Sequence, residues 1–207
     1  GVRFLIFVSG CPMRCQFCHN PDTWSMKTGT QMSADELLDK AWKYRSYWGK
    51  SGGITVSGGE PLLQIDFLLE LFKKAKEKGI RITYIDSYTK EELQDLTVAT
   101  DNVNAGRMLG EYARKLIDKD SKIAIVSHVK GVSTAVEREQ GFREGLGDYA
   151  DNIVDIVYCN SLYEKSYELA QELMRKYPDL ELIAGMNEYS AVGVGRAVSD
   201  AGAKDKI

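Results

Sequence analysis

Short apolar runs rich in β-branched or aromatic residues alternate with amphipathic helical patterns along the whole chain of 207 residues. This alternation is typical of repeated βα units, in which each helix returns the chain so that it can add a parallel strand. The sequence therefore predicts an α/β protein built from parallel βα repeats. The expected strands are residues 3–8, 53–57, 80–85, 122–127, 153–158 and 180–184.

Helices are expected between these strands. Ser33 and Glu36 form a capping box ahead of apolar residues at helical spacing, which predicts a helix start. Residues 66–78 form the next helical stretch, with Gly79 as its stop signal. Further helices fit residues 103–117, 134–146, 163–176 and 189–201.

Composition excludes several classes of function. The formal net charge is −3, with no basic run, so the chain lacks the positive field that nucleic acid requires. No apolar stretch approaches the roughly 20 residues that span a bilayer, and the N-terminus lacks the order of a signal peptide. We therefore expect a cytoplasmic protein with no membrane span. The chain begins inside an expected strand and stops where another could begin, so both ends are expected to be cut.

Three of the four cysteines lie within eight residues, in the segment GCPMRCQFCHNPDTW directly after the first strand. This crowding disfavours disulfides and favours a shared metal at a carboxyl strand end. Three thiolates leave one coordination position open, which is typical of a reactive site. Zinc completed by His19 is the structural alternative, although adjacent residues such as His19 and Cys18 rarely bind one ion. Cys159 lies in an apolar run and is expected to be a buried thiol.

The C-x3-C-x2-C spacing, CHNPDTW and YRSYWGKSGGITVSGGEPLLQ resemble the radical S-adenosylmethionine (SAM) superfamily. Within it, residues 1–80 are similar to activating enzymes of glycyl-radical enzymes, that of pyruvate formate-lyase in particular. The resemblance implies a 4Fe–4S cluster and SAM as cofactors. It also implies three cysteine ligands, an aromatic residue near adenine and a GGE motif near the SAM ammonium, which are Cys11, Cys15, Cys18, Phe17, Gly58, Gly59 and Glu60.

In that family an electron from the cluster cleaves SAM, and the resulting deoxyadenosyl radical takes hydrogen from a glycine of the partner. The resemblance therefore implies a glycyl-radical enzyme, such as pyruvate formate-lyase, as partner. It assigns no catalytic residue other than the cofactor ligands.

After residue 80 the sequence resembles another family. The segments VATDNVNAGRMLGEYARKL, KIAIVSHVKGVSTAVEREQGFREGL and LIAGMNEYSAVGVGRAV are similar to sugar-type periplasmic solute-binding proteins. The resemblance implies a Rossmann-like or flavodoxin-like lobe and a sugar-like ligand contacted by Asp86, Asn102, Arg138 and Asn187. Two structural alternatives remain open: Asp101 and Asn102 could cap a helix, and Arg138 could be a solvated surface residue.

The sequence is therefore interpreted as a chimera, with a partial radical SAM barrel segment in residues 1–80 and a binding-protein lobe in residues 81–207. A single merged α/β sheet is an alternative arrangement. Three hypotheses on function follow. The chain is an activase-type iron–sulfur protein with reduced turnover, a sugar-binding module, or a recombined fold without activity.

Overall fold

The computed structural model describes residues 1–12, 18–88, 91 and 93–207, and the chain forms two compact units. Unit 1 comprises Gly1–Thr83 with Glu91–Leu96, and unit 2 comprises Tyr84–Lys90 with Thr97–Ile207. Two short strands, β3 (Thr83–Ile85) and β4 (Leu96–Val98), pair with each other where the chain passes between the units.

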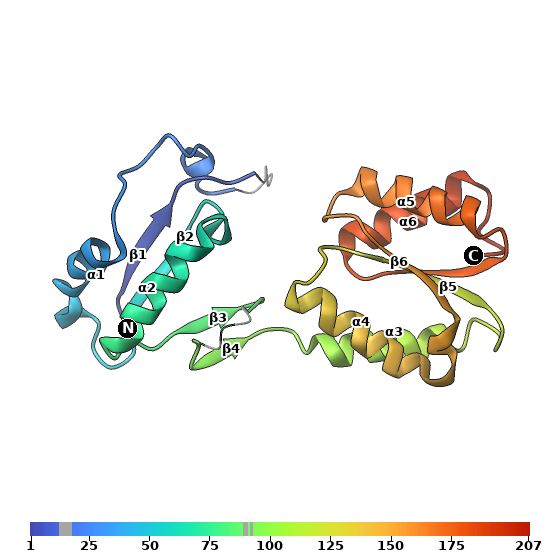
Figure 1. The fold of residues 1–207 in the computed structure, drawn as a ribbon, viewed down its shortest axis with the longest axis horizontal. Helices are drawn as coiled ribbons and strands as arrows, with labels where there is room; N and C mark the ends of the chain where they lie inside the picture. Colours follow the sequence, from blue (N-terminus) through green and yellow to red (C-terminus); the bar gives the residue numbers. More distant parts are fainter. Residues whose placement is uncertain (13–17, 89–90, 92) are drawn as a thin grey trace. The chain divides into compact units, whose positions relative to one another are not determined.

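Unit 1 contains a two-stranded parallel sheet whose strands are β1 (Arg3–Val8) and β2 (Gly53–Gly58). Helices α1 (Ala34–Trp42) and α2 (Ile65–Glu77) pack on one face of this sheet (Figure 1). The capping box of α1 is present, because the Ser33 amide donates to Glu36 Oε2 at 2.8 Å and the Glu36 amide to Ser33 Oγ at 3.3 Å. Short 3₁₀ helices complete the unit: η1 (Pro21–Trp24), η2 (Arg45–Tyr47) and η3 (Pro61–Gln64).

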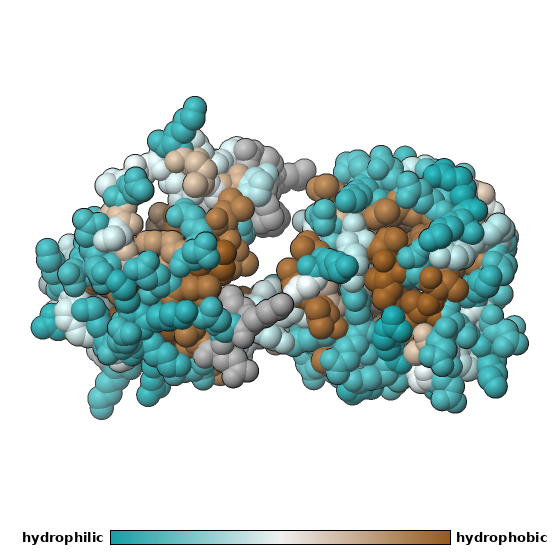
Figure 2. All heavy atoms as spheres, in the orientation of Figure 1, coloured by the Kyte–Doolittle hydropathy of each residue, from teal (hydrophilic) through white to brown (hydrophobic). Residues whose placement is uncertain are grey.

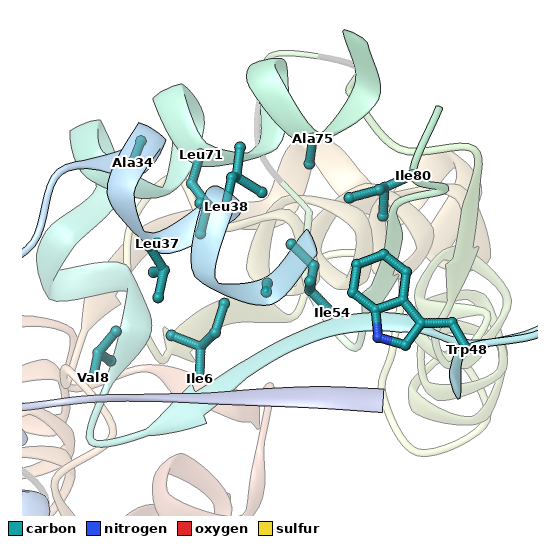
Figure 3. Packing of buried hydrophobic residues seen from close by; sticks show 11 residues of the cluster. Ile6, Val8, Ala34, Leu37, Leu38, Trp48, Ile54, Leu71, Ala75 and Ile80 are labelled. Carbon is teal, nitrogen blue, oxygen red and sulfur yellow. The ribbon is translucent and has the colours of Figure 1, made fainter. Parts of the chain in front are cut away.

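The core of unit 1 lies between the sheet and its two helices, as Figure 3 shows. Alternate residues of β1, Ile6 and Val8, point to this side and are buried against the apolar faces of α1 and α2. The intervening residues Leu5 and Phe7 point away from the core and are 55% and 49% exposed. One face of the sheet is therefore covered by helices, whereas the other carries exposed apolar side chains.

Unit 2 is a three-layer α/β structure. Its parallel sheet has the order β6–β5–β7, formed by β5 (Lys122–Ser127), β6 (Ile153–Tyr158) and β7 (Leu180–Gly185). In Figure 1, α3 and α4 lie on one side of this sheet and α5 and α6 on the other. The helices and the connecting 3₁₀ segment are α3 (Asn102–Ala113), α4 (Ser133–Leu146), η4 (Gly147–Asn152), α5 (Tyr163–Lys176) and α6 (Glu188–Asp200).

The central strand β5 has no side chain facing solvent beyond its first residue, because both faces of the sheet are covered. Figure 2 shows hydrophilic side chains over much of the visible surface of each unit, with patches of hydrophobic residues among them. Among the described residues, none of the helices combines the length and the apolar character needed to cross a membrane.

The parallel α/β class predicted from the sequence is confirmed, but details differ. The third expected strand, residues 80–85, is shorter in the structure, where only Thr83–Ile85 form β3. Ile80 and Ile82 are buried but lie before this strand. The strand β4 was not predicted, since three residues are too short for a periodic signal. The helical pattern at 103–117 overestimates α3, which ends at Ala113. The strands of the two units form separate sheets in the described residues, not one merged sheet, and no radical SAM barrel is formed.

Candidate functional sites

The base of the cysteine loop is fixed by backbone hydrogen bonds from two sides. On one side, the Gly10 amide donates to Thr23 O at 2.7 Å and the Cys11 amide donates to Trp24 O at 3.1 Å. On the other side, the Gly59 amide donates to Val8 O and the Glu60 amide to Gly10 O, both at 2.8 Å. The point at which the loop leaves β1 is therefore held by the end of β2 and by η1.

The two glycines of the GGE motif are required by this close approach. A Cβ atom on Gly59 would lie 2.3 Å from Gly10 O and 3.0 Å from Val8 O, both of which are backbone atoms. Gly58 has φ +100°, and its Cβ would lie 2.8 Å from Phe7 Cα. Only glycine therefore allows the end of β2 to contact the start of the cysteine loop.

Two side chains at the end of β2 extend this arrangement. Glu60 Oε1 accepts from the Leu62 amide at 2.9 Å and so caps η3, while Gln64 Nε2 donates to Ser9 O at 3.0 Å. The first contact holds the Glu60 carboxylate at the start of η3. The sequence identified Glu60 through its motif, but it missed Gln64, whose role depends on a contact across 55 residues.

Cys11 and Cys18 are partly exposed, as a ligand site for a bound group requires. Cys15 and Phe17 lie outside the described residues. Within the described part of the chain, no three or more His, Cys, Asp or Glu side chains are placed so that they could hold a metal ion together. The donor chemistry still fits an iron–sulfur cluster, since thiolates are its ligands and the loop base is fixed.

A second polar site lies in unit 2, at the carboxyl ends of its parallel strands. Arg138 of α4 donates from Nε to Asn102 Oδ1 at 2.8 Å and from Nη1 to Met186 O at 2.9 Å. Asn102 is 2% exposed and donates from Nδ2 to Thr100 O and to Glu137 Oε2. These bonds link the N-terminus of α3, the first turns of α4 and the end of β7.

Two of the residues suggested by the sugar-binding resemblance, Asn102 and Arg138, meet here, and a histidine that the sequence did not single out lies at the end of β5. His128 follows β5, is 7% exposed and shares a 2.9 Å hydrogen bond between its Nε2 and Thr134 Oγ1. Burial lowers the pKa of His128, and the nearby positive charge of Arg138 lowers it further, whereas Glu139 and Asp86 oppose the shift. Asp86, Arg138 and Glu139 therefore lie within electrostatic reach of one imidazole.

Three buried polar atoms at the end of β5 and on α4 have no hydrogen-bond partner among the described residues: Ser127 Oγ, His128 Nδ1 and Glu139 Oε1. The other carboxylate oxygen of Glu139 accepts from the Tyr158 hydroxyl at 3.3 Å. Burial, followed by the charge of Glu139, raises the pKa of Tyr158. The strand ends thus present polar groups that remain able to bond, as a polar ligand requires.

Asn187 follows β7 and caps α6, since its Oδ1 accepts from the Ser190 amide at 2.9 Å. Its Nδ2 reaches Ser161 Oγ at 3.5 Å, so its donor side is directed across the strand ends. Asp86 lies in a left-handed conformation with φ +73°. Of the structural alternatives, Asp101 does cap α3 by accepting from the Asn104 amide at 3.0 Å, whereas Arg138 is half-buried and bonded inside the unit rather than solvated.

A further pair completes this network: Glu137 accepts from the Tyr88 hydroxyl at 2.6 Å, and this bond is the main cause of the raised pKa of Tyr88. The sequence did not identify Tyr88, Glu137, His128 or Glu139, because their roles arise from contacts between distant segments. The adjacency of Glu137, Arg138 and Glu139 at the start of a helix was the only local signal.

The fold and its two sites define an α/β protein in two parts, one with a hydrogen-bonded base of the cysteine loop and one with polar strand ends. Residues 53–207 match the family model described as "Periplasmic binding protein domain". A pyruvate formate-lyase-activating enzyme of Clostridium pasteurianum is 31% identical over an alignment covering 100% of this chain and 86% of that enzyme. The chain therefore belongs both to the periplasmic binding protein domain family and to the pyruvate formate-lyase-activating enzymes.

Two further matches distinguish the parts, and a third shows the fold. The activating enzyme of Listeria monocytogenes is 58% identical over 88 residues, which are 42% of this chain, and the chain thus spans about a third (35%) of that relative. A solved sugar transporter from Clostridium phytofermentans is 32% identical, with a TM-score of 0.65, and the match covers 84% of this chain and 74% of that one. A fructose-binding periplasmic domain has a TM-score of 0.66 at 16% identity, covering 98% of this chain and 70% of that one, and shows the same fold.

The family model begins at Gly53, inside unit 1, and so includes β2 and α2. The binding-protein family model therefore includes a βα unit that belongs to unit 1. A parallel βα repeat fits both families, because each family places a strand and the helix that follows it in the same relation. The two-part character predicted from the sequence is confirmed by these matches.

Proposed function

We propose that unit 1 is an iron–sulfur unit of the glycyl-radical activase type, in which Cys11, Cys15 and Cys18 hold a 4Fe–4S cluster and the GGE strand end binds SAM. The observation that carries this proposal is the loop base fixed by Gly59 and Glu60. The names of the Listeria monocytogenes and Clostridium pasteurianum relatives, both of them activating enzymes, support it. When bound, the cluster would supply the electron that cleaves SAM.

The residues of the chain would perform three tasks in this proposal. The cysteine thiolates bind iron, and Phe17 packs against adenine. Glu60 and the backbone at Gly58 and Gly59 accept hydrogen bonds from the SAM ammonium. We expect cofactor binding with little turnover on a glycyl-radical partner. The reason is that β1 and β2 form a two-stranded sheet in the described residues, with Leu5 and Phe7 exposed, so support around the site is incomplete.

Anaerobic reconstitution with iron and sulfide, followed by electron paramagnetic resonance with and without SAM, tests this proposal. We expect the paramagnetic signal of the reduced cluster. This signal should change when SAM is added, and Cys15→Ala should abolish it. Cys159→Ala is the matched control, because this thiol is fully buried in unit 2 and should leave the signal unchanged. The absence of a cluster, or one zinc ion per chain in its place, would refute the proposal.

We propose a second function for unit 2, the binding of a sugar-like ligand at the carboxyl ends of its strands. The specific observation in its favour is the convergence of Arg138, Asn187 and the unpartnered polar atoms of His128 and Glu139. Sugar hydroxyls both donate and accept, so they need such mixed groups. The membership of residues 53–207 in a binding-protein family supports it.

Within this site we assign Asn187 and Asp86 as the ligand contacts. Arg138 and Asn102 act by positioning, because their bonds to each other and to Met186 O hold the strand ends together. Calorimetry with D-glucose, D-galactose, D-fructose and D-ribose tests the proposal. Asn187→Asp keeps a capping acceptor but removes the amide donors, so it should abolish binding without unfolding α6. Uniformly absent heat in the unsubstituted protein would count against a sugar ligand.

A further inference from the structure

Two tyrosines form an exposed aromatic pair beside the strand ends of unit 2. Tyr163 is the first residue of α5 and Tyr189 lies in the first turn of α6, and their ring centroids are 4.7 Å apart at an interplanar angle of 46°. The two residues are 37% and 38% exposed. The rings therefore form a tilted surface that is open to solvent and is not used for packing in the core.

This pair is held in place by its surroundings. The Tyr163 hydroxyl donates to Glu188 Oε1 at 2.9 Å, which fixes one ring relative to the start of α6. The first turns of α5 and α6 also approach closely, since a Cβ atom on Gly193 would lie 2.7 Å from Tyr163 O. Ser166 Oγ donates to Ser190 O at 2.8 Å between the same helices. The tyrosine side chains should therefore lose little conformational entropy when a ligand contacts them.

The turn that leads into α5 places the pair next to the proposed sugar site. Asn160 and Ser161 follow β6 with φ values of +53° and +54°, a left-handed conformation that non-glycine residues seldom adopt twice in succession. This turn brings Ser161 Oγ to 3.5 Å from Asn187 Nδ2. Tyr163 comes two residues after Ser161, and Tyr189 two residues after Asn187, so the pair and this contact belong to the same two helix starts.

We propose that Tyr163 and Tyr189 form a stacking subsite for a second sugar ring, so that the ligand of unit 2 is a disaccharide or longer saccharide. The proposal rests on the sugar-binding function proposed above. The C–H face of a pyranose is apolar and packs on aromatic rings, while its hydroxyls require polar partners at the edge of the same surface. Glu188, Ser161 and Asn187 provide such partners around the pair.

The second ring, rather than the first, is assigned to this pair because of its position. The polar groups near His128 and Arg138 are buried at the strand ends, whereas the two tyrosines belong to the first turns of the helices and are partly exposed. A ring bound against the strand ends would direct its glycosidic substituent outward. We therefore assign the exposed pair to such a substituent.

Calorimetry on the full chain tests this inference with matched probes: D-glucose against maltose, D-galactose against lactose, and D-fructose against sucrose. We expect one disaccharide to bind five- to tenfold more tightly than its monosaccharide, as one aromatic contact would provide. Tyr163→Ala and Tyr189→Ala should remove this gain and leave monosaccharide binding within about twofold. Tyr163→Phe should keep the gain, because it keeps the ring.

Two controls make the result specific. Tyr112→Ala removes a tyrosine that is 59% exposed on α3, and it should not change either affinity. Tyr163→Leu keeps apolar volume but lacks an aromatic face, so it should lose the gain even if Tyr163→Ala unfolds. Disaccharide binding that survives both alanine variants, or that Tyr163→Phe loses as fully as Tyr163→Ala, would overturn the inference. Monosaccharide binding without any disaccharide gain would overturn it as well, but would leave the proposed sugar site standing.

Discussion

Gly141 of α4 offers a test in which helix propensity and tertiary packing predict opposite signs. Helices α3 and α4 are in backbone contact through glycines on both sides. A Cβ atom on Gly141 would lie 1.9 Å from Val103 O and 2.9 Å from the Arg107 amide nitrogen. The same closeness recurs at three further glycines of this interface, Gly106, Gly110 and Gly145.

The expected cost follows from these distances. An ordinary Cβ contact begins at about 3.4 Å, so Gly141→Ala forces α3 away from α4 along rigid backbone, and no flexible side chain can yield. Such overpacking costs about 1–3 kcal/mol, and separation of the helices also disturbs the buried Phe142 and Leu146. The replacement gains at most about 1 kcal/mol of helix propensity. We expect a net loss of about 1–2 kcal/mol in the free energy of unfolding of unit 2.

Gly195→Ala is the matched control. Gly195 lies inside α6, its added Cβ would meet no atom within 4 Å, and only helix propensity applies. This variant should gain about 0.5–1 kcal/mol. Urea unfolding followed by far-ultraviolet circular dichroism measures both variants, since four of the helices lie in unit 2. If Gly141→Ala is as stable as Gly195→Ala, the packing described for α3 and α4 is refuted.

Three further predictions concern the sites. Gly59→Ala should separate β2 from the base of the cysteine loop. We expect the unfolding midpoint measured by tryptophan fluorescence to fall and bound iron to decrease several-fold. Unchanged iron content would contradict this prediction. Because burial and Arg138 lower the pKa of His128 below 6.5, the folded form resists protonation, so unit 2 should lose stability as the pH falls below that value. His128→Gln should make the urea midpoint depend less on pH between about pH 7.5 and 5.5. An unchanged pH dependence in this range would show that His128 is not its cause. Arg138→Met removes the bonds to Asn102 and Met186 O and should cost about 2–3 kcal/mol in urea unfolding, whereas a loss below about 0.5 kcal/mol would show that these bonds contribute little.

The sequence predicted the elements whose signals are local. Hydrophobic periodicity identified β1, β2, β5, β6 and β7, and the Ser33–Glu36 capping box marked the start of α1, because these patterns depend on neighbouring residues. The cysteine spacing and the GGE motif located the candidate cofactor site for the same reason. The roles of Cys11, Cys15, Cys18 and the proposed sugar contacts stay predictions until cofactor and ligand binding are measured.

The tertiary structure alone decided how distant segments meet. Gly59 looked like a ligand-facing glycine in the sequence, yet its lack of a side chain is needed first for contact with Gly10 O. His128 carried no motif, because its shifted pKa arises from burial and from charges on α4 and near β3. The Tyr163–Tyr189 pair likewise depends on two helices that begin 25 residues apart. Short-range patterns are written in the order of residues, whereas close approach, burial and charge coupling exist only once the strands and helices have packed.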